Sequence, residues 1–154
     1  MVEGHGVHRS AFQHRRKLLG RRFYAVSPSG RFKEGAAAIS GRVLVRVEVH
    51  GKELFHFWSK PGGSGETAAD DLVVVRIHFG MSGRFLTTAG ASLLSEATDK
   101  TRLRLMELPA SGGEEVPGDE LEGLVLQEGC AAQVSAQVCE HGGLELYEAR
   151  CKVL

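Results

Sequence analysis

The first three residues, Met1, Val2 and Glu3, place a potential nucleophile beside a potential proton carrier. A small residue at position 2 favours removal of the initiator methionine, which leaves the α-amino group of Val2 free. An α-amino group has a pKa of about 7.7 to 8.0, whereas a lysine amine has one near 10.4. The Val2 amine is therefore a candidate for imine formation at neutral pH, with Glu3 as its proton carrier. The alternative is an ordinary chain start that carries no chemistry.

A second candidate lies in the segment HFGMSGRF, residues 78–85, which places Met81 between two glycines directly after an apolar run. A flexible apolar side chain on such a turn could fill the gap that an extruded nucleotide leaves in a base stack, because the filler restores part of the lost stacking energy. Arg84 follows closely and supplies a cation. The alternative is that Met81 fills the protein core.

Charge is distributed unevenly along the chain, although the formal net charge is zero. Through Lys60 the chain carries twelve basic and four acidic residues, a net charge of +8, and the remainder carries −8. A basic first part with five histidines fits a surface that faces phosphates, and the acidic segment 112–128 is typical of a solvated loop. The alternative is a pattern that serves solubility.

The three cysteines, Cys130, Cys139 and Cys151, form no CxxC pair and have no histidines at zinc-ligand spacing. They predict free thiols and no metal site. No apolar run is long enough to span a bilayer, and the amino terminus lacks a secretory hydrophobic block. We therefore expect an intracellular protein with no membrane contact, in the nucleus or a DNA-containing organelle if eukaryotic and in the cytoplasm if bacterial.

The candidates need a scaffold, and a length of 154 residues favours a single domain. Apolar residues at near-helical intervals predict an amphipathic helix over residues 5–19, with a basic polar face and Gly20 as its stop. Valines that alternate over residues 43–49 predict a half-buried strand. A hairpin is expected to join it to residues 52–58 and to present Lys52 at its turn.

Further strands are predicted over residues 72–79, 83–87, 101–108, 133–139 and 144–149. Segments 60–71 and 109–123 are rich in Gly, Ser, Pro and acidic residues, which predicts long surface loops. Short strands with glycine-rich joins favour a mainly β fold with a few helices. We expect a two-sheet antiparallel β-sandwich with an N-terminal amphipathic helix.

Five blocks of sequence, in their order and spacing, resemble the Fpg/Nei family of DNA glycosylases, and most closely its actinobacterial Nei-like subgroup. The blocks are MVEGHGVHR at residues 1–9, SPSGRF at 27–32, GRVL at 41–44, GKELFHF at 51–57 and HFGMSG at 78–83. The resemblance implies a bifunctional DNA glycosylase and AP lyase of base-excision repair. It implies removal of oxidised bases, with oxidised pyrimidines preferred, by a monomer that acts on damaged double- or single-stranded DNA.

The resemblance also implies three catalytic residues. Val2 attacks the deoxyribose C1′ and forms a Schiff base, Glu3 is the general acid and proton shuttle, and Lys52 holds the phosphate next to the lesion. Val2 stands where most members carry proline, and a primary amine also forms imines. Gly6 stands where many relatives carry a second glutamate.

Met81, Arg84 and Arg31 are the residues expected to contact DNA, with Met81 at the position of a void-filling side chain. The likeness is strong to about Leu86 and faint over residues 101–154. We expect residues 1–154 to be the family's N-terminal catalytic domain, without its helix-two-turn-helix and zinc-finger domains. No cofactor is expected, because zinc lies in the finger of full-length relatives. Fewer phosphate contacts predict weak activity.

Two other functions remain open. A non-catalytic damaged-DNA-binding remnant, or a truncated gene product, would keep the basic part of the chain and lose turnover. A β-sandwich interaction module with no nucleic-acid role would be supported by the acidic second half alone.

Overall fold

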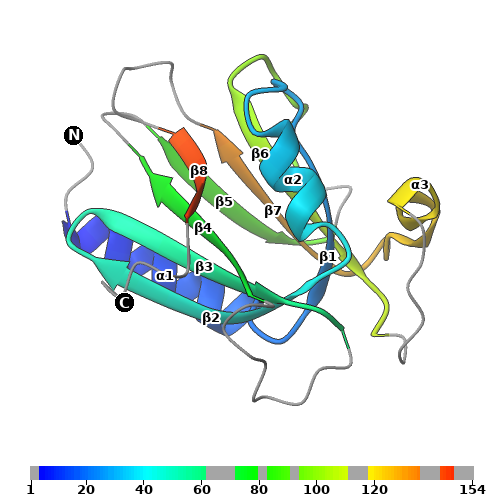
Figure 1. The fold of residues 1–154 in the computed structure, drawn as a ribbon, viewed down its shortest axis with the longest axis horizontal. Helices are drawn as coiled ribbons and strands as arrows, with labels where there is room; N and C mark the ends of the chain where they lie inside the picture. The colour runs from blue at the N-terminus through cyan, green and yellow to red at the C-terminus, as the bar shows by residue number, and fades with distance from the viewer. Residues whose placement is uncertain are drawn as a thin grey trace.

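The computed structural model describes residues 4–61, 72–79, 83–90, 94–110, 118–135 and 143–147 (Figure 1). The elements of these ranges, in chain order, are α1 (Gly4–Lys17), β1 (Arg22–Val26), α2 (Lys33–Ile39), β2 (Val43–His50), β3 (Glu53–Ser59), β4 (Val73–His78), β5 (Arg84–Ala89), β6 (Thr101–Leu108), α3 (Gly118–Leu121), the 3₁₀ helix η3 (Glu122–Leu124), β7 (Cys130–Ser135) and β8 (Gly143–Tyr147). The predicted class, mainly β with an N-terminal helix, is confirmed.

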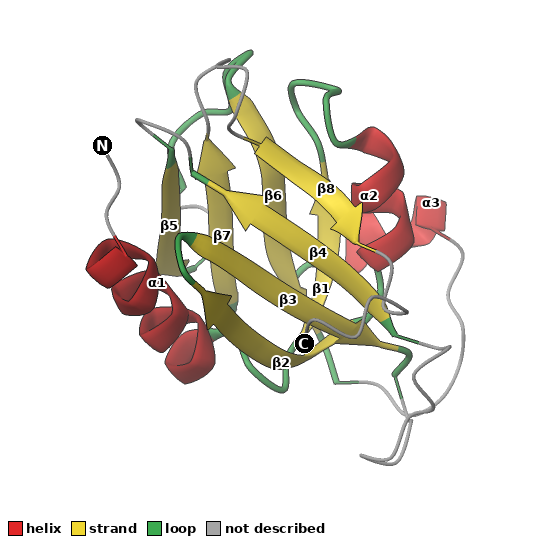
Figure 2. Cartoon of the chain, turned by 60° about the vertical axis from the view of Figure 1, so that its left-hand side comes forward, coloured by secondary structure: helices red, strands yellow, loops and turns green. Residues whose placement is uncertain are grey.

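The eight described strands form one hydrogen-bonded sheet in the order β5-β7-β6-β1-β2-β3-β4-β8. The recorded pairings are antiparallel, and β1 meets β2 at the single pair Arg22 and Val43. Figure 2 shows β2, β3 and β4 crossing in front of β5, β7 and β6, so the sheet folds over at this junction. The expected separation into two sheets is not confirmed, because hydrogen bonds link all eight strands.

The hydrophobic core lies between the two halves of the folded sheet. It draws Leu44, Leu54 and Ile77 from one half and Phe23 and Leu105 from the other, all fully buried. Helix α1 adds one face to the same cluster. Apolar burial is the main stabilising contribution to such a fold, so this shared cluster holds the halves together.

Strand β2 departs from the simple alternation that its valines predict. A register shift between Leu44 and Arg46 marks an irregularity at Val45. Leu44 and Val47 consequently both face the core, whereas Val45 is 44% exposed. A bulge places an extra residue in one strand, which moves the following side chains to the opposite face.

The hairpin between β2 and β3 is confirmed, with His50 paired to Glu53 across its turn. Gly51 has a φ of +65°, a backbone conformation that glycine adopts without steric cost. Strand β3 is buried on both faces beyond this turn: Leu54 and Trp58 join the main core, and Phe55 joins a second cluster. The hairpin therefore has a rigid base and an exposed tip.

Four elements, β1, α2, α3 and η3, were not predicted from the sequence. Strand β1 lies in the middle of the sheet, between β2 and β6. Helix α2 contributes Ala36 and Ile39 to the core and packs against β1. Helix α3 falls in segment 109–123, which was expected to be a loop, and segment 60–71 lies mostly outside the described residues. Cys130 is a free thiol, as predicted, and the other two cysteines lie outside the described residues.

Among the described residues, no helix is both long enough and apolar enough to cross a membrane. The same residues contain no group of three or more His, Cys, Asp or Glu side chains that could hold a metal ion.

Gly83 closes the connection that follows β4. Its N–H donates a 2.8 Å hydrogen bond to the carbonyl oxygen of Phe79. A Cβ atom at position 83 would lie 2.4 Å from that oxygen and 2.7 Å from the Phe79 Cα, which are backbone atoms that cannot swing aside. The second glycine of HFGMSGRF is therefore required by the close approach of two backbone segments.

We expect Gly83→Ala to lower the free energy of unfolding by about 1–3 kcal/mol, the usual cost of forcing atoms into a packed site. Gly123→Ala is the matched control, because a Cβ atom there meets no heavy atom within 4 Å. The control should change stability by less than about 0.5 kcal/mol. Urea unfolding of both variants measures the difference, and equal stabilities would contradict the proposed clash.

Candidate functional site

Three chain segments that lie far apart in the sequence meet at one end of the molecule. They are the first turn of α1, the tip of the β2–β3 hairpin and the connection from β4 to β5. Glu53, which follows Lys52, pairs with His78 at the end of β4. Figures 1 and 2 both show the hairpin tip beside the N-terminal end of α1. The elements that carry Lys52 and Arg84 therefore lie at the same end of the molecule as the beginning of α1, the helix that follows Val2 and Glu3 in the sequence.

A hollow of about 250 Å³ lies between α1 and the beginning of β5. Its lining residues are Gly6, Ser10, Phe79, Gly83, Arg84, Phe85 and Leu86. Gly6 adds no side chain to this wall, so α1 approaches β5 without filling the space between them. A glutamate at position 6 would extend a charged side chain from this turn.

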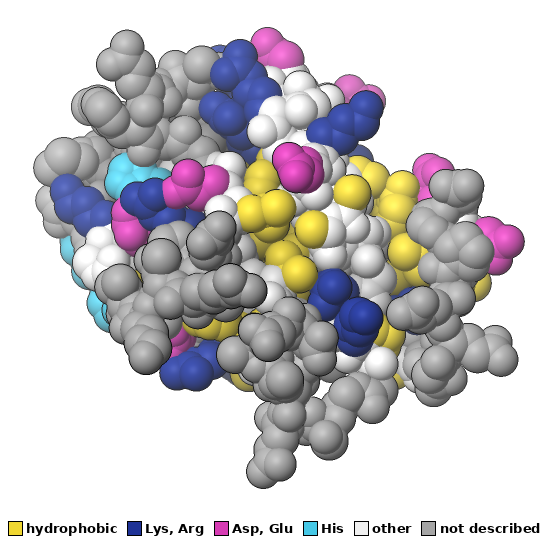
Figure 3. Space-filling view, viewed as in Figure 1, with side chains coloured by type: hydrophobic (Ala, Val, Ile, Leu, Met, Phe, Trp, Pro, Cys, Tyr) yellow, Lys and Arg dark blue, Asp and Glu magenta, His cyan; other side chains and the backbone are white. Residues whose placement is uncertain are grey.

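Lys52 and Arg84 are both exposed and both lie at this end of the molecule. Lys52 occupies the turn of the hairpin, and Arg84 begins β5 and lines the hollow. Figure 3 shows histidine, basic and acidic side chains gathered along the left edge, over the hairpin tip. An exposed ammonium and an exposed guanidinium at one end of the molecule are suited to bind phosphate groups.

Val2, Glu3 and Met81 lie outside the described residues. The described residues next to them are Gly4, the first residue of α1, and Phe79 and Gly83, which flank the Met81 segment. Their assigned roles stay predictions from the sequence.

Arg31 lies elsewhere. It lines a second hollow of about 430 Å³, next to Lys33 at the beginning of α2 and Glu145 and Leu146 of β8. Among the described residues, this hollow shares no lining residue with the one beside Arg84. The sequence grouped Arg31 with Arg84, and the fold separates them.

The outer face of the hairpin is braced by charged side chains on three adjacent strands. Arg76 of β4 donates hydrogen bonds to Glu53 of β3 and Glu145 of β8. The hydrogen bond to Glu53 is the main cause that raises the pKa of Arg76. This bridge ties the first residue of β3, immediately after Lys52, to the strands beside it.

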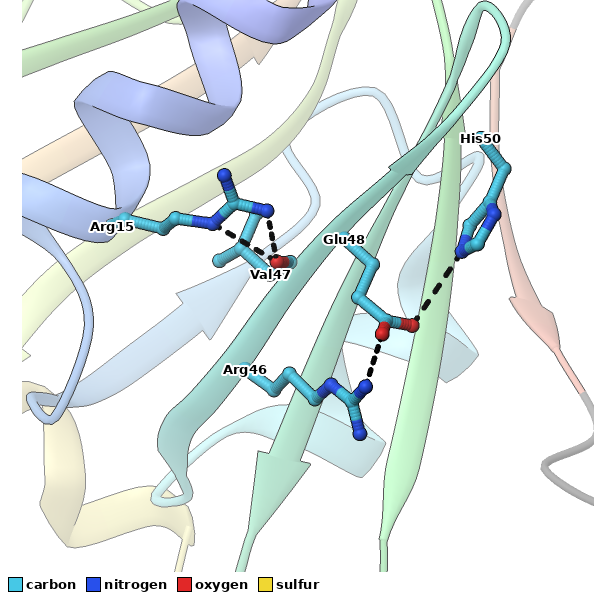
Figure 4. A network of polar contacts seen from close by, with 5 residues as sticks. All are labelled: Arg15, Arg46, Val47, Glu48 and His50. Atoms are coloured by element: carbon cyan, nitrogen blue, oxygen red, sulfur yellow. Dashed lines mark hydrogen bonds and ion pairs between the residues drawn. The ribbon is translucent and has the colours of Figure 1, made fainter. Parts of the chain in front are cut away.

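Strand β2 carries a second polar network, drawn in Figure 4. On its outer face Arg46 forms an ion pair with Glu48, whose other carboxylate oxygen lies 3.6 Å from Nε2 of His50. From the other side, Arg15 of α1 donates two hydrogen bonds to the Val47 carbonyl oxygen, 3.1 Å from Nε and 2.7 Å from Nη2. The helix that begins at the candidate site is thus anchored to the hairpin.

Two histidines meet inside the core below this site. Nδ1 of His14 on α1 lies 3.0 Å from Nε2 of His56 on β3, and both side chains are fully buried. The ring of Phe85 on β5 lies 3.9 Å from the His14 ring and 5.4 Å from the His56 ring, measured between centroids. Three elements that carry site residues therefore meet at one polar contact.

Both imidazoles are neutral in this environment. Burial lowers the pKa of His56 to about 3, and burial followed by the proximity of His56 lowers the pKa of His14 well below its ordinary value. One neutral ring must donate and the other accept. Whichever tautomers are present, one N–H and one ring lone pair are left over, because His14 Nε2 and His56 Nδ1 have no hydrogen-bond partner.

The sequence analysis missed this pair. His14 lies on the same helical face as Val7, Ala11 and Leu18, which are all fully buried, so its spacing alone could have placed it in the core. Nothing in the sequence could have indicated that His56 lies opposite, because the two residues belong to elements that are distant in the chain.

Comparison with known proteins gives a consistent result. The model of the formamidopyrimidine-DNA glycosylase N-terminal domain matches residues 1–116. Endonuclease 8 1 of Mycobacterium tuberculosis and that of Mycobacterium bovis are each 37% identical to this chain over 108 residues. That alignment covers 69% of this chain and 36% of each relative, so the chain matches about a third of the length of these proteins.

Solved structures share the fold. A structure of MutM in complex with DNA containing carbocyclic 8-oxo-G has a TM-score of 0.61 and 12% identity, and the match covers 94% of this chain and 44% of that one. A Lactococcus lactis Fpg complex with abasic-site DNA has a TM-score of 0.61 and 12% identity over 95% of this chain and 44% of that one. At this identity the likeness concerns the fold.

The buried histidine pair predicts a loss of stability in acid. Unfolded histidines take up protons near pH 6.5, whereas the folded pair resists protonation until well below that value, so the unfolded state binds more protons as the pH falls. Between about pH 7.5 and pH 5, the free energy of unfolding should fall by about 2 kcal/mol for each histidine.

Urea unfolding at a series of pH values measures this slope. The control is the double variant His14→Leu/His56→Leu, which removes both groups and should lose the histidine part of the slope. An identical pH dependence in the variant would contradict the assignment.

Proposed function

The chain belongs to the formamidopyrimidine-DNA glycosylase family, and from this membership we propose that it excises oxidised bases from DNA through its N-terminal amine. The observation that carries the proposal is the convergence of the elements bearing the predicted residues, within a domain that the family model matches over residues 1–116. Oxidised pyrimidines are the proposed preferred substrates, from the resemblance of the sequence blocks to the Nei-like subgroup. The named groups come from one chain, so a monomer suffices.

The proposed reaction begins with attack of the Val2 nitrogen on C1′ of the damaged nucleotide. A nitrogen–carbon bond forms, the glycosidic bond breaks, and the departing base leaves with a proton. Transfer of a proton to O4′ then opens the sugar ring and leaves an imine between Val2 and C1′. Glu3 carries the protons in both steps.

Strand cleavage follows from the imine. The protonated imine acidifies the C2′ hydrogen, whose removal expels the 3′ phosphate by elimination. Hydrolysis of the imine by water then frees the amine. Division of one difficult displacement into these steps is the usual advantage of a covalent intermediate.

The described residues support the required positions. Lys52 is exposed at a hairpin tip whose base is tied by Glu53 and Arg76, so its ammonium can meet a phosphate from a rigid support. Arg84 offers a second cation beside the hollow. Helix α1, which follows Val2 and Glu3 in the sequence, begins at Gly4 on the same side.

We expect the 154-residue chain with a free Val2 amine to be trapped covalently on abasic-site DNA by borohydride. The matched control is the same protein with an N-terminal tag still attached. Its amine is displaced, so trapping should fall to background. Denaturing electrophoresis measures the adduct, and mass spectrometry verifies that Met1 is absent.

Equal trapping by the tagged protein would exclude the N-terminal amine as the nucleophile. Binding to abasic-site DNA without any trapping would instead assign the chain to the non-catalytic DNA-binding class. Absence of binding at low salt would favour the interaction module.

Lys52→Gln should weaken binding to abasic-site DNA about tenfold and reduce the slope of log K against log salt by about 0.9, because one phosphate contact is lost. Lys60→Gln is the matched control: Lys60 is also exposed but follows the opposite end of β3. Fluorescence anisotropy over a salt series measures both variants. If the two substitutions weaken binding equally, the proposed contact between Lys52 and a DNA phosphate is contradicted.

A further inference from the structure

The His14–His56 contact is a side-chain hydrogen bond that joins α1 directly to β3. The remaining buried residues described in α1, Val7 and Ala11, are apolar, as is buried Leu18 just after the helix. Apolar contacts are non-directional, so they leave a helix free to slide or turn slightly on the surface beneath it. A hydrogen bond between two rings fixes both the distance and the orientation.

The pair is not explained by stability. Each ring has one nitrogen without a hydrogen-bond partner, and a buried polar atom without a partner is unfavourable. Two aliphatic side chains of similar size would fill the same space without this penalty. A polar contact that opposes stability calls for another role.

The position of the pair suggests that role. His14 lies ten residues after Gly4, about 15 Å along the helix, so a tilt of about 5° about His14 would move the N-terminal end by more than about 1 Å. A displacement of about 1 Å at a reacting group can slow a reaction about 100-fold. On the other side, His56 lies four residues after Lys52 on a strand buried on both faces.

The third partner completes the arrangement. Phe85 contacts both imidazole rings, and it follows Arg84 directly in β5. The contact among His14, His56 and Phe85 thus links three elements. They are α1, which follows the N-terminal amine in the sequence, β3, which follows Lys52, and β5, which begins with Arg84. Arg15, which holds the Val47 carbonyl, anchors the same helix to β2 alone.

We propose that His14 and His56 are positioning residues, which fix the orientation of α1 and thereby hold the N-terminal amine in register with Lys52 and Arg84. This inference rests on the proposed function, because it assigns the pair a part in that reaction. Neither histidine touches the DNA; both act through the elements that they join.

The test uses the full chain in four forms: wild type, His14→Leu, His14→Leu/His56→Leu and Ile39→Val. The single histidine variant leaves His56 buried without its partner and should be the least stable. The double variant restores apolar packing and should be at least as stable as wild type near neutral pH. Ile39→Val is a control for modest core loss, since Ile39 is fully buried in α2.

Single-turnover trapping on abasic-site DNA and equilibrium DNA binding are measured for each form. The inference expects the double variant to be trapped at least about 10-fold more slowly, while its DNA affinity stays within about 2-fold of wild type. Ile39→Val should be trapped at the wild-type rate. A purely structural role would leave the stable double variant at the wild-type rate, and that result would overturn the inference.

Hydrogen exchange of the α1 amides gives a readout independent of catalysis. The inference expects faster exchange in α1 of the double variant, with β6 unchanged, and unchanged α1 exchange would overturn it. If wild type is not trapped under any condition, the proposed function fails, and the exchange data still decide whether the pair orients the helix.

Discussion

The docking of α1 across the folded sheet is the constraint on which the rest of the molecule depends. This helix contacts β2, β3 and β5, which belong to opposite halves of the sheet. Its buried face joins the central core, Arg15 holds the backbone of β2, and His14 meets His56. Because α1 begins at Gly4, the same docking determines on which side of the molecule the first described residue lies.

The junction between β1 and β2 is held by both backbone hydrogen bonds and side-chain packing. β1 and β2 share one residue pair, whereas β2 and β3 share seven, and further backbone hydrogen bonds at the junction include the one from Leu44 N–H to the Arg21 carbonyl oxygen. The core residues between the halves, together with α1 along one side, reinforce this connection. A rigid relation between Lys52 on one half and Arg84 on the other follows from this shared core.

Local and strongly periodic features were predictable from the sequence. The helical spacing of Val7, Ala11 and Leu18 located α1, and the turn at Gly51 located the hairpin with Lys52 at its tip. Strand β1 and helix α2 were missed because five and seven residues are too few to show a clear period. The outward position of Val45 depends on an irregularity that alternation cannot reveal.

The candidate site was predictable as a set of residue types but not as an arrangement. Lys52, Arg84 and Arg31 were all predicted as site residues from the sequence. The pairing of distant strands brings Lys52 and Arg84 to one end of the molecule, whereas Arg31 lines a different hollow. The contact between His14 and His56 likewise depends on which face of β3 lies beneath the helix. Such contacts join residues that are distant in the chain, so they could not be predicted from the sequence alone.

The charged side chains on the outer face of the hairpin also set the local charge of that face. Two arginines, Arg46 and Arg76, share that face with three carboxylates, those of Glu48, Glu53 and Glu145, so these five groups sum to one negative charge. A polyanion that approaches the outer face of the hairpin is weakly repelled by these groups, whereas one that approaches the hairpin tip meets Lys52. In the proposed function, these charged side chains therefore both support the hairpin and disfavour approach of DNA to its outer face.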